Sequence, residues 1–148
     1  FDLNIFFQWS YGNDLVNANR LNFETGNKTY LNQFASFQGR WTPENTTSNI
    51  PRAGGQVGYV YSTRIIEDGS YLRFKTAALG YTLSSKLLRN VKIKSCRFYI
   101  AAQNLLTWTK YSGSDPEVSI NYSALTPGFD YSAYPRARTI TAGLNLSL

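Results

Sequence analysis

The chain has 148 residues, of which 43% are hydrophobic, 16% aromatic and 16% charged, and its formal net charge is +6. The low charge and high aromatic content exclude a disordered chain, and the length fits one ordinary domain. Histidine is absent, Cys96 is the only cysteine and no glycine-rich phosphate loop occurs. Ser-His-Asp hydrolysis, histidine metal sites and an intrachain disulfide are therefore excluded, and we expect neither an enzyme nor a bound metal or cofactor.

The first predicted strand covers residues 1–11, where apolar and polar residues alternate with a period of two. Its apolar face consists of Phe1, Leu3, Ile5, Phe7, Trp9 and Tyr11. Among the residues between them, only Phe6 interrupts the polar face.

A long connection, residues 12–70, follows this strand. Its aromatic residues recur at the i, i+4, i+7 and i+11 spacing of one helix face: Tyr30, Phe34, Phe37 and Trp41. This spacing predicts a short helix over residues 28–38, which Pro43 would stop.

The second predicted strand, residues 71–83, is less regular. Its early apolar residues, Leu72 and Phe74, lie in one phase of the alternation, and the later Leu79 and Tyr81 lie in the other. We expect either a bulge near residues 77–80, at Ala77-Ala78 or Gly80, or burial of both faces at that end.

A short basic turn, residues 84–93, comes next. Within residues 84–97 there are five cations and no acid, namely Lys86, Arg89, Lys92, Lys94 and Arg97, and they account for most of the net charge. A nucleic-acid interface would need a broader basic stripe with interleaved aromatic residues, so we expect no nucleic acid as a partner. The turn fits either a solvated loop or a cationic rim beside lipid headgroups.

Two further strands are predicted at residues 94–105 and 138–148. The third strand has Cys96, Phe98, Ile100 and Ala102 on one face. The fourth alternates as cleanly as the first, with Ile140, Ala142, Leu144, Leu146 and Leu148 on one face.

The connection between these strands, residues 106–137, is again long. The long connections contain aromatic residues that either bind a ligand or pin the loops together: Trp41, Tyr122, Phe129, Tyr131 and Tyr134. Aromatic residues at the strand ends fit a core or a membrane-interface girdle better than sugar stacking: Trp9, Tyr11, Tyr71, Trp108 and Tyr111.

Carboxylate candidates are few. Glu67 and Asp68 precede Gly69, which a turn explains well. Asp115, before Pro116, fits a cation or sugar contact or simply a proline-set turn. No second ligand or base accompanies either group, so neither indicates catalysis or a metal site.

The spacing of the strands suggests a membrane protein. No apolar run approaches the ~18–20 residues of a membrane helix, but strands of ~9–11 residues fit a tilted membrane strand. Outer-membrane barrels alternate short periplasmic turns with long extracellular loops, as the connections do here. We therefore predict an all-β fold, an antiparallel transmembrane β-barrel wall with one short loop helix and the C-terminus on the periplasmic side. The alternative is a soluble β-rich carbohydrate-binding module, whose apolar strand faces would pack against one another.

Five stretches together resemble the SusC/RagA family, TonB-linked outer-membrane nutrient transporters of Bacteroidetes-type bacteria. They are RWTPEN at 40–45, IPR at 50–52, DGSYLRFK at 68–75 running on to LGYTL at 79–83, RFYIAAQNLLTWTKYSGSDPE at 97–117, and YPRARTITAGLNLSL at 134–148. The resemblance covers essentially the whole chain, in order.

The resemblance implies that residues 1–148 are the C-terminal part of a barrel of about 22 strands closed around an N-terminal plug. The chain starts at Phe1 and has no methionine, and we expect it to be a piece of something longer. The implied function is TonB-dependent import of oligosaccharides or peptides. The implied partners are a SusD-like surface lipoprotein, the TonB complex through the missing N-terminal part, outer-membrane lipid and the barrel assembly machinery.

Residue roles follow from the same resemblance. The expected lipid-facing residues are Leu3, Ile5, Phe7, Phe98, Ile100, Ile140, Leu144 and Leu146. The residues expected to face the lumen or the plug are Asn4, Gln8, Arg73, Lys75, Arg97 and Gln103. The candidates for substrate or lid contact are Trp41, Tyr111, Asp115, Tyr122 and Tyr131. Leu144, Leu146 and Leu148 would form the C-terminal assembly signal, in which Leu148 stands where the family usually has an aromatic residue.

Overall fold

The computed structural model describes residues 1–28, 30–55, 58–89, 93–117 and 128–147. The chain forms two compact units. The sheet unit comprises residues 1–11, 71–109 and 136–148, and the loop unit comprises residues 12–70 and 110–135. No helix in the described ranges is both long enough and apolar enough to cross a membrane.

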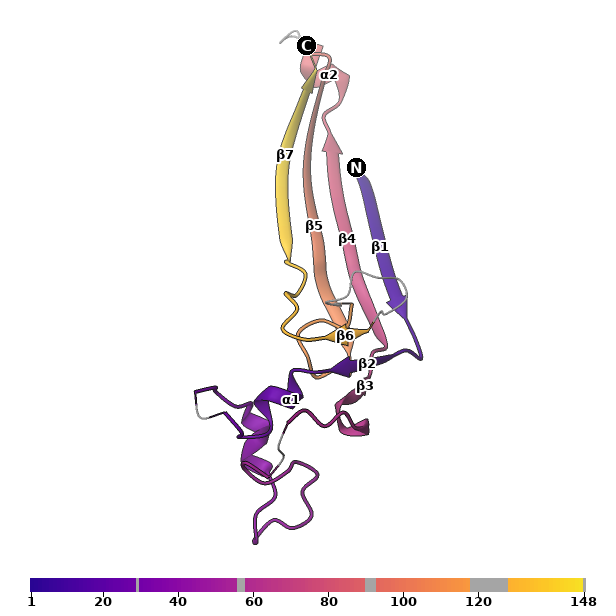
Figure 1. The fold of residues 1–148 in the computed structure, drawn as a ribbon. Coiled ribbons are helices and arrows are strands. Elements are labelled where there is room, and N and C mark those ends of the chain that lie inside the picture. The colour runs from indigo at the N-terminus through magenta and orange to yellow at the C-terminus, as the bar shows by residue number, and fades with distance from the viewer. Residues whose placement is uncertain (29, 56–57, 90–92, 118–127, 148) are drawn as a thin grey trace. The chain divides into compact units, whose positions relative to one another are not determined.

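The sheet unit contains one antiparallel sheet with the strand order β1-β4-β5-β7 (Figure 1). Its strands are β1 (Asp2–Ser10), β4 (Tyr71–Thr82), β5 (Ser95–Thr109) and β7 (Thr139–Ser147), and the short helix α2 (Ser85–Leu88) lies between β4 and β5. The four predicted strands are confirmed, although β5 continues four residues beyond its expected end at residue 105. Because neighbouring strands are antiparallel, both long connections leave the sheet at one end and the short turn lies at the other.

The expected bulge in β4 exists, but it lies at Lys75. Phe6 pairs with Thr76 and Phe7 pairs with Phe74, so Lys75 is an extra residue opposite β1. This position is two residues before the predicted one. The extra residue changes the phase of the strand, so the early and late apolar residues of β4 reach the same side of the sheet.

The opposite strand is irregular at the same level. Between Phe74 and Thr76 of β4, the partner residues on β5 jump from Leu106 to Gln103. Asn104, inside this jump, has a φ of 52°, and asparagine is one of the residues that tolerate this left-handed region. Its amide donates to the carbonyl oxygen of Ala137 at 3.0 Å, so the irregular residue is held in place.

Apolar side chains form continuous rows across one face of the sheet. One row runs from Leu3 through Leu79 and Ile100 to Ala142, and in another the rings of Phe7 and Phe74 stack with centroids 4.8 Å apart. Most large apolar residues of this apolar face, though not Phe74, remain 40–72% exposed: Leu3, Ile5, Phe7, Trp9, Leu72, Leu79, Tyr81, Phe98, Ile100, Leu106, Trp108, Ile140, Leu144 and Leu146. A soluble module would have to bury such a face, so its exposure argues against that alternative.

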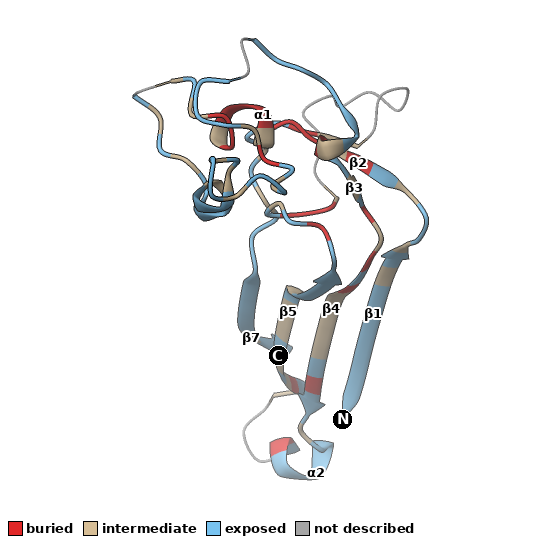
Figure 2. Ribbon diagram, turned by 90° about the horizontal axis from the view of Figure 1, so that it is seen from below, coloured by how far each residue is buried: buried red, intermediate tan, exposed pale blue. Residues whose placement is uncertain are grey.

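The loop unit has its own small sheet and core. Its sheet has the order β3-β2-β6, in which β2 (Asp14–Asn17) runs antiparallel to β3 (Ile66–Asp68) and parallel to β6 (Phe129–Asp130). Helix α1 (Arg20–Phe23) and two 3₁₀ helices, Ala35–Gly39 and Thr63–Ile65, complete it. Ala18, Leu21 and Ile65 form the buried cluster, with Val16 and Phe129 packed against it. In Figure 2 the buried residues of this unit gather around β2 and α1.

The helix predicted over residues 28–38 does not form among the described residues of that range. The backbone N–H of Phe34 donates to the carbonyl oxygen of Phe23 at 2.8 Å instead of to a residue one helical turn earlier. The ring of Phe34 also packs on the ring of Phe23, with centroids 5.2 Å apart. The aromatic spacing therefore reflects loop contacts, and the 3₁₀ helix Ala35–Gly39 is the only helical structure there in the described residues.

Candidate functional site

A half-buried carboxylate, that of Glu67, joins the two chain segments of the loop unit. Oε1 of Glu67 accepts hydrogen bonds from Nδ2 of Asn17 at 3.0 Å and from Oγ of Ser112 at 2.8 Å. Its Oε2 accepts the backbone N–H of Ser112 at 2.8 Å. Burial acts to raise the pKa of Glu67, but these hydrogen bonds and the charge of Arg20 outweigh it and lower the pKa. Glu67 therefore lies in a short strand as a structural anchor, where the sequence suggested a turn.

A second carboxylate holds the first segment together. Glu24 is buried and accepts hydrogen bonds from Nε of Arg20 at 2.8 Å, Nη1 of Arg64 at 2.7 Å and Oγ of Ser36 at 2.7 Å. Burial lowers the pKa of Arg64, and the charge of Glu24 opposes that effect. The two networks fix the backbone from which the exposed loop residues project.

Tyr111 has a buried polar contact. Its hydroxyl group donates to Oδ2 of Asp130 at 2.6 Å, and the two residues are 5% and 2% exposed. Burial, with the added effect of Asp130, raises the pKa of Tyr111, so the hydroxyl group stays protonated. In this conformation Tyr111 therefore has little exposed surface for the substrate or lid contact that the sequence predicts.

Asp115 is also buried, and it closes a turn. Its Oδ1 accepts the backbone N–H of Glu117 at 2.9 Å, which is the geometry of an Asx turn. The turn interpretation of this segment therefore has direct structural support. A partner contact by Asp115 remains a prediction.

A small aromatic pocket of about 210 Å³ contains Tyr131, another of the predicted contact residues. The residues around it are Ala18, Leu21, Asn22, Tyr59, Tyr61, Phe129 and Tyr131. Oδ1 of Asn22 accepts hydrogen bonds from the Tyr59 hydroxyl group at 3.1 Å and from Nζ of Lys28 at 3.4 Å. A hydrogen bond to Tyr59 raises the pKa of Lys28. An apolar floor with a few polar groups at one edge is typical of ligand pockets.

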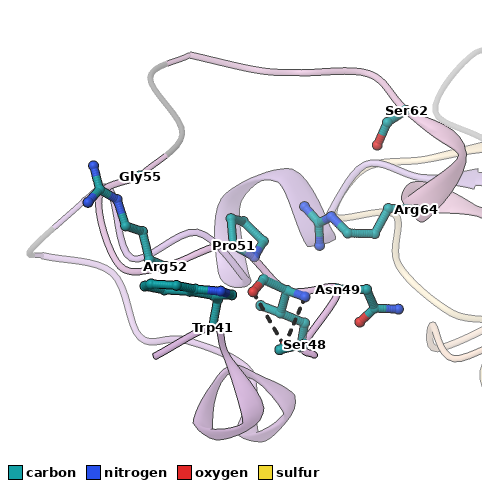
Figure 3. Close-up of a pocket in the computed structure, with 9 residues that line it drawn as sticks. Trp41, Ser48, Asn49, Pro51, Arg52, Gly55, Ser62 and Arg64 are labelled. Carbon is teal, nitrogen blue, oxygen red and sulfur yellow. Dashed lines mark hydrogen bonds between the residues drawn. The ribbon is translucent and has the colours of Figure 1, made fainter. Parts of the chain in front are cut away.

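A larger, open pocket of about 700 Å³ contains Trp41 (Figure 3). It is lined by Trp41, Ser48, Asn49, Ile50, Pro51, Arg52, Gly55, Ser62 and Arg64. The backbone N–H of Trp41 donates to the carbonyl oxygen of Ile50 at 2.8 Å. The hydroxyl group of Ser48 lies 2.6 Å from the carbonyl oxygen of Gly39, to which it donates. These bonds fold residues 39–50 back on themselves and hold the indole at the pocket.

The polar face of the sheet lies opposite the apolar face. It carries the six residues predicted to face a lumen or plug: Asn4, Gln8, Arg73, Lys75, Arg97 and Gln103. Nε2 of Gln8 donates to the Tyr71 hydroxyl group at 3.0 Å, and Lys75 donates to Gln8. Arg97 pairs with Asp2 at the other end of β1. The two faces of the sheet therefore differ sharply in chemistry.

The remaining predicted residues divide as follows. Leu144 and Leu146 lie on the apolar face, paired with Phe98 and Cys96 of β5. Tyr122 and Leu148 lie outside the described residues. In the part of the chain that the structure describes, no three His, Cys, Asp or Glu residues gather as metal ligands.

Sequence reasoning missed several residues of both pockets. Tyr59 and Tyr61 of the smaller pocket stand two residues apart in the sequence. Their segment has the pattern of irregular structure, so the sequence gives no reason to place them at a pocket. Arg52 stands in a recognised sequence stretch, but nothing local connects it with Arg64. That residues this far apart in the chain line one pocket becomes visible only in the folded structure.

Comparisons with known proteins cover the whole chain. It is 37% identical over 151 residues to TonB-dependent receptor P3 of Formosa agariphila, a match that covers 99% of the chain and 15% of the receptor. It is 36% identical over 153 residues to TonB-dependent receptor P26 of the same organism, with the same coverage. No family model matches the chain.

Solved structures that resemble this chain also come from a transporter. The RagAB peptide transporter superposes with a TM-score of 0.80 and 30% sequence identity, covering 97% of this chain and 15% of that one. The RagAB peptide importer in its 'open-open' state gives a TM-score of 0.81, also at 30% identity. The chain thus spans about 15% of the length of the relatives that it matches.

Proposed function

Because the chain is similar over nearly its whole length to TonB-dependent receptors and to the RagAB peptide transporter, we propose that it belongs to the SusC/RagA family and forms part of the wall and the external loops of a TonB-dependent importer. The observation that carries this proposal is a single sheet with a broad exposed apolar face and an opposite polar face. Such a sheet is satisfied when lipid covers one side and a polar interior covers the other.

In this proposal the four long strands span the membrane. The apolar face contacts the acyl chains, and the residues Asn4, Gln8, Arg73, Lys75, Arg97 and Gln103 face the lumen or a plug. The outer edges of β1 and β7 pair with other strands of a barrel of about 22 strands. The short turn after β4 and the C-terminus lie on the periplasmic side, and both long connections reach the cell exterior.

The loop unit then supplies the external surface of the importer. We propose that it contacts substrate and a SusD-like lipoprotein, with Trp41 and Tyr131 at two pockets as the first residues to test. Energy would come from the TonB complex acting on a plug that these residues do not include. The cargo is a peptide or an oligosaccharide. The RagAB structures are named for a peptide transporter, which supports the first class.

An uptake experiment tests the proposed function. The gene that encodes this chain is deleted in its native bacterium, and uptake of fluorescent peptide and oligosaccharide pools is compared with the parent strain and with a strain lacking TonB. We expect one class of cargo to be lost in both mutants and restored by the intact gene. Unchanged uptake of both pools in the deletion strain, with transcription of the gene in the parent confirmed, would refute the proposal.

A further inference from the structure

The positive charge of the chain is concentrated in the sheet unit. The residues of this unit include nine lysines and arginines but a single acid, Asp2, which already pairs with Arg97. The loop unit contains more acids than cations. The sheet unit therefore has an excess of positive charge that its one acidic side chain cannot neutralise, and an anionic partner would complement it.

Three exposed cations of this unit lie in residues 84–94, the cationic turn. Lys86 lies in α2, Arg89 directly follows α2, and Lys94 directly precedes β5. None of the three makes an ion pair in the part of the chain that the structure describes. Ser84 and Ser85 at the start of the turn are exposed as well. Ammonium, guanidinium and hydroxyl groups all donate hydrogen bonds to phosphate oxygens, so the turn has the donors that a phosphate group requires.

Backbone hydrogen bonds hold the cationic turn on the sheet. The N–H of Leu83, just after β4, donates to the carbonyl oxygen of Cys96 at 2.9 Å, and the N–H of Lys94 donates to the carbonyl oxygen of Ser147 at 2.8 Å. Leu88 of α2 is 6% exposed, so one side of this short helix packs inward. The cations therefore lie at the end of the sheet where β4 and β7 end (Figure 1).

Lys94 follows the apolar face of β5 in phase. On this strand the apolar face runs from Trp108 to Cys96, and Lys94 is the next residue with the same period of two. The row is about 40 Å long at ~3.3 Å per residue, which is about 28 Å across a membrane when the strand is tilted by ~45°. Because the hydrocarbon core of a bilayer is ~30 Å thick, Lys94 would stand where acyl chains end and headgroups begin.

An exposed leucine distinguishes the cationic turn from an ordinary solvated loop. Leu87 lies next to Lys86 in α2 and is 67% exposed. Apolar side chains beside lysine and arginine are typical of segments at a membrane surface, where the apolar group enters the acyl region and the cations stay with the phosphates. The turn therefore fits a lipid surface better than it fits water alone.

We propose that the cationic turn binds the phosphate group of anionic phospholipids in the periplasmic leaflet through Lys86, Arg89 and Lys94. The proposal rests on the proposed function because it needs the apolar face to lie in a membrane. It adds a headgroup preference, which an apolar face alone does not produce. A zwitterionic phospholipid has no net charge, so the turn should distinguish it from an anionic one.

Lipid binding is measured by native mass spectrometry on the purified full-length protein in a non-ionic detergent. The probe is phosphatidylglycerol, and its control is phosphatidylcholine with the same acyl chains. We expect phosphatidylglycerol to bind about tenfold more tightly, because each cation near an anionic surface contributes a factor of up to about five. Equal binding of the two lipids would overturn the proposal.

Two double variants assign this preference to the cationic turn. Lys86→Gln with Lys94→Gln should reduce the preference for phosphatidylglycerol about fivefold or more and leave phosphatidylcholine binding unchanged. Lys86→Arg with Lys94→Arg keeps both charges and should retain the preference. Loss of the preference in both double variants would show that the shape of the turn matters and its charge does not, which would also overturn the proposal.

A charge control lies in the loop unit. Arg40→Gln with Arg52→Gln removes the same number of cations outside the cationic turn and should leave the preference unchanged. An equal loss in this control would show a general effect of net charge and contradict a specific lipid contact. An undiminished preference after removal of Lys86 and Lys94 would place anionic lipid elsewhere and leave the turn to another partner, which contradicts the proposal as well.

The outcome remains separate from that of the uptake experiment. Loss of TonB-dependent uptake on gene deletion, together with equal binding of the two lipids, contradicts only the lipid contact. A preference for phosphatidylglycerol that depends on the cationic turn, without any TonB-dependent uptake, contradicts only the proposed function.

Discussion

The carboxylate of Glu67 accepts both the backbone N–H and the hydroxyl group of Ser112, each at 2.8 Å, across 45 residues of sequence. This pair links the connection that follows β1 to the connection that follows β5. The two longest irregular stretches of the chain thereby become one folded unit with a shared small sheet.

Replacing Glu67 by glutamine should loosen that unit. Glutamine cannot accept at both oxygen positions, and it loses the charge near Arg20, so we expect the loop unit to lose about 1–3 kcal/mol of local stability. Hydrogen exchange of residues 12–17 and 110–117 in the full-length protein measures the effect. Glu44→Gln, at an exposed position, is the matched control and should change exchange little.

The stability of the loop unit should also depend on pH through Glu67. Its folded pKa is lowered below the ordinary value of 4.5, so its contribution is fully present above that value and is lost as the pH falls through the folded pKa. We therefore compare the hydrogen exchange of the same residues in the wild type and in Glu67→Gln. The difference between the two proteins should be smaller at acidic pH than at pH 6. An undiminished difference there would show that the carboxylate charge is unimportant.

Tyr111→Phe should destabilise the loop unit by about 1–2 kcal/mol, because Oδ2 of the buried Asp130 loses the hydroxyl donor at 2.6 Å. Limited proteolysis of the full-length protein reports the loss as faster cleavage in the loops. Tyr134→Phe removes the same hydroxyl group from an exposed residue and serves as the control. Comparable cleavage rates for the two variants would argue against a structural role for Tyr111.

A charge on the apolar face should impair membrane assembly. Ile100→Lys places a cation in the middle of the apolar face, at an expected cost of about 2–4 kcal/mol if lipid covers it. The folded fraction in outer membranes, read from heat-modifiable gel mobility, should fall. Thr141→Lys lies on the opposite face, paired with Ala101, and should be tolerated better. A lower folded fraction for Thr141→Lys than for Ile100→Lys would contradict the proposal that lipid covers the apolar face.

Tyr131→Ala should weaken cargo uptake if the aromatic pocket binds substrate. An aromatic contact is worth about 0.5–1.5 kcal/mol, so the half-saturating cargo concentration should rise about two- to tenfold. Uptake by cells that carry the variant measures this change. Tyr134→Ala, which removes an exposed ring outside the pocket, is the control, and an equal effect of both variants would remove the pocket from the transport pathway.

The strands were predictable because their signal is local. Alternation with a period of two marks each long strand within its own segment, and the phase change between Phe74 and Leu79 indicates a bulge. The sequence pattern could not place the bulge at Lys75, because the extra residue is defined only by pairing with β1. The limits of prediction thus follow from which contacts are local.

The loops were less predictable for the same reason. The aromatic spacing from Tyr30 to Trp41 suited a helix, but the backbone of Phe34 bonds to Phe23 instead. Trp41 and Tyr131 were singled out as exposed aromatic residues in loops, and both line pockets. Arg64 and Asn22, which line the same two pockets, carry no such signal, because an arginine or asparagine in a loop is ordinary until the fold brings it to a pocket.

The buried cluster of Ala18, Leu21 and Ile65 belongs entirely to the loop unit. Substitutions that reshape the exposed tips of these loops therefore leave the strand registers untouched, and changes along the strands leave that cluster intact. In the proposed importer, the loop unit can therefore vary while the sheet is kept, and residues 12–70 together with 110–135 form the segment to exchange in chimaeras that test whether the loop unit sets cargo preference.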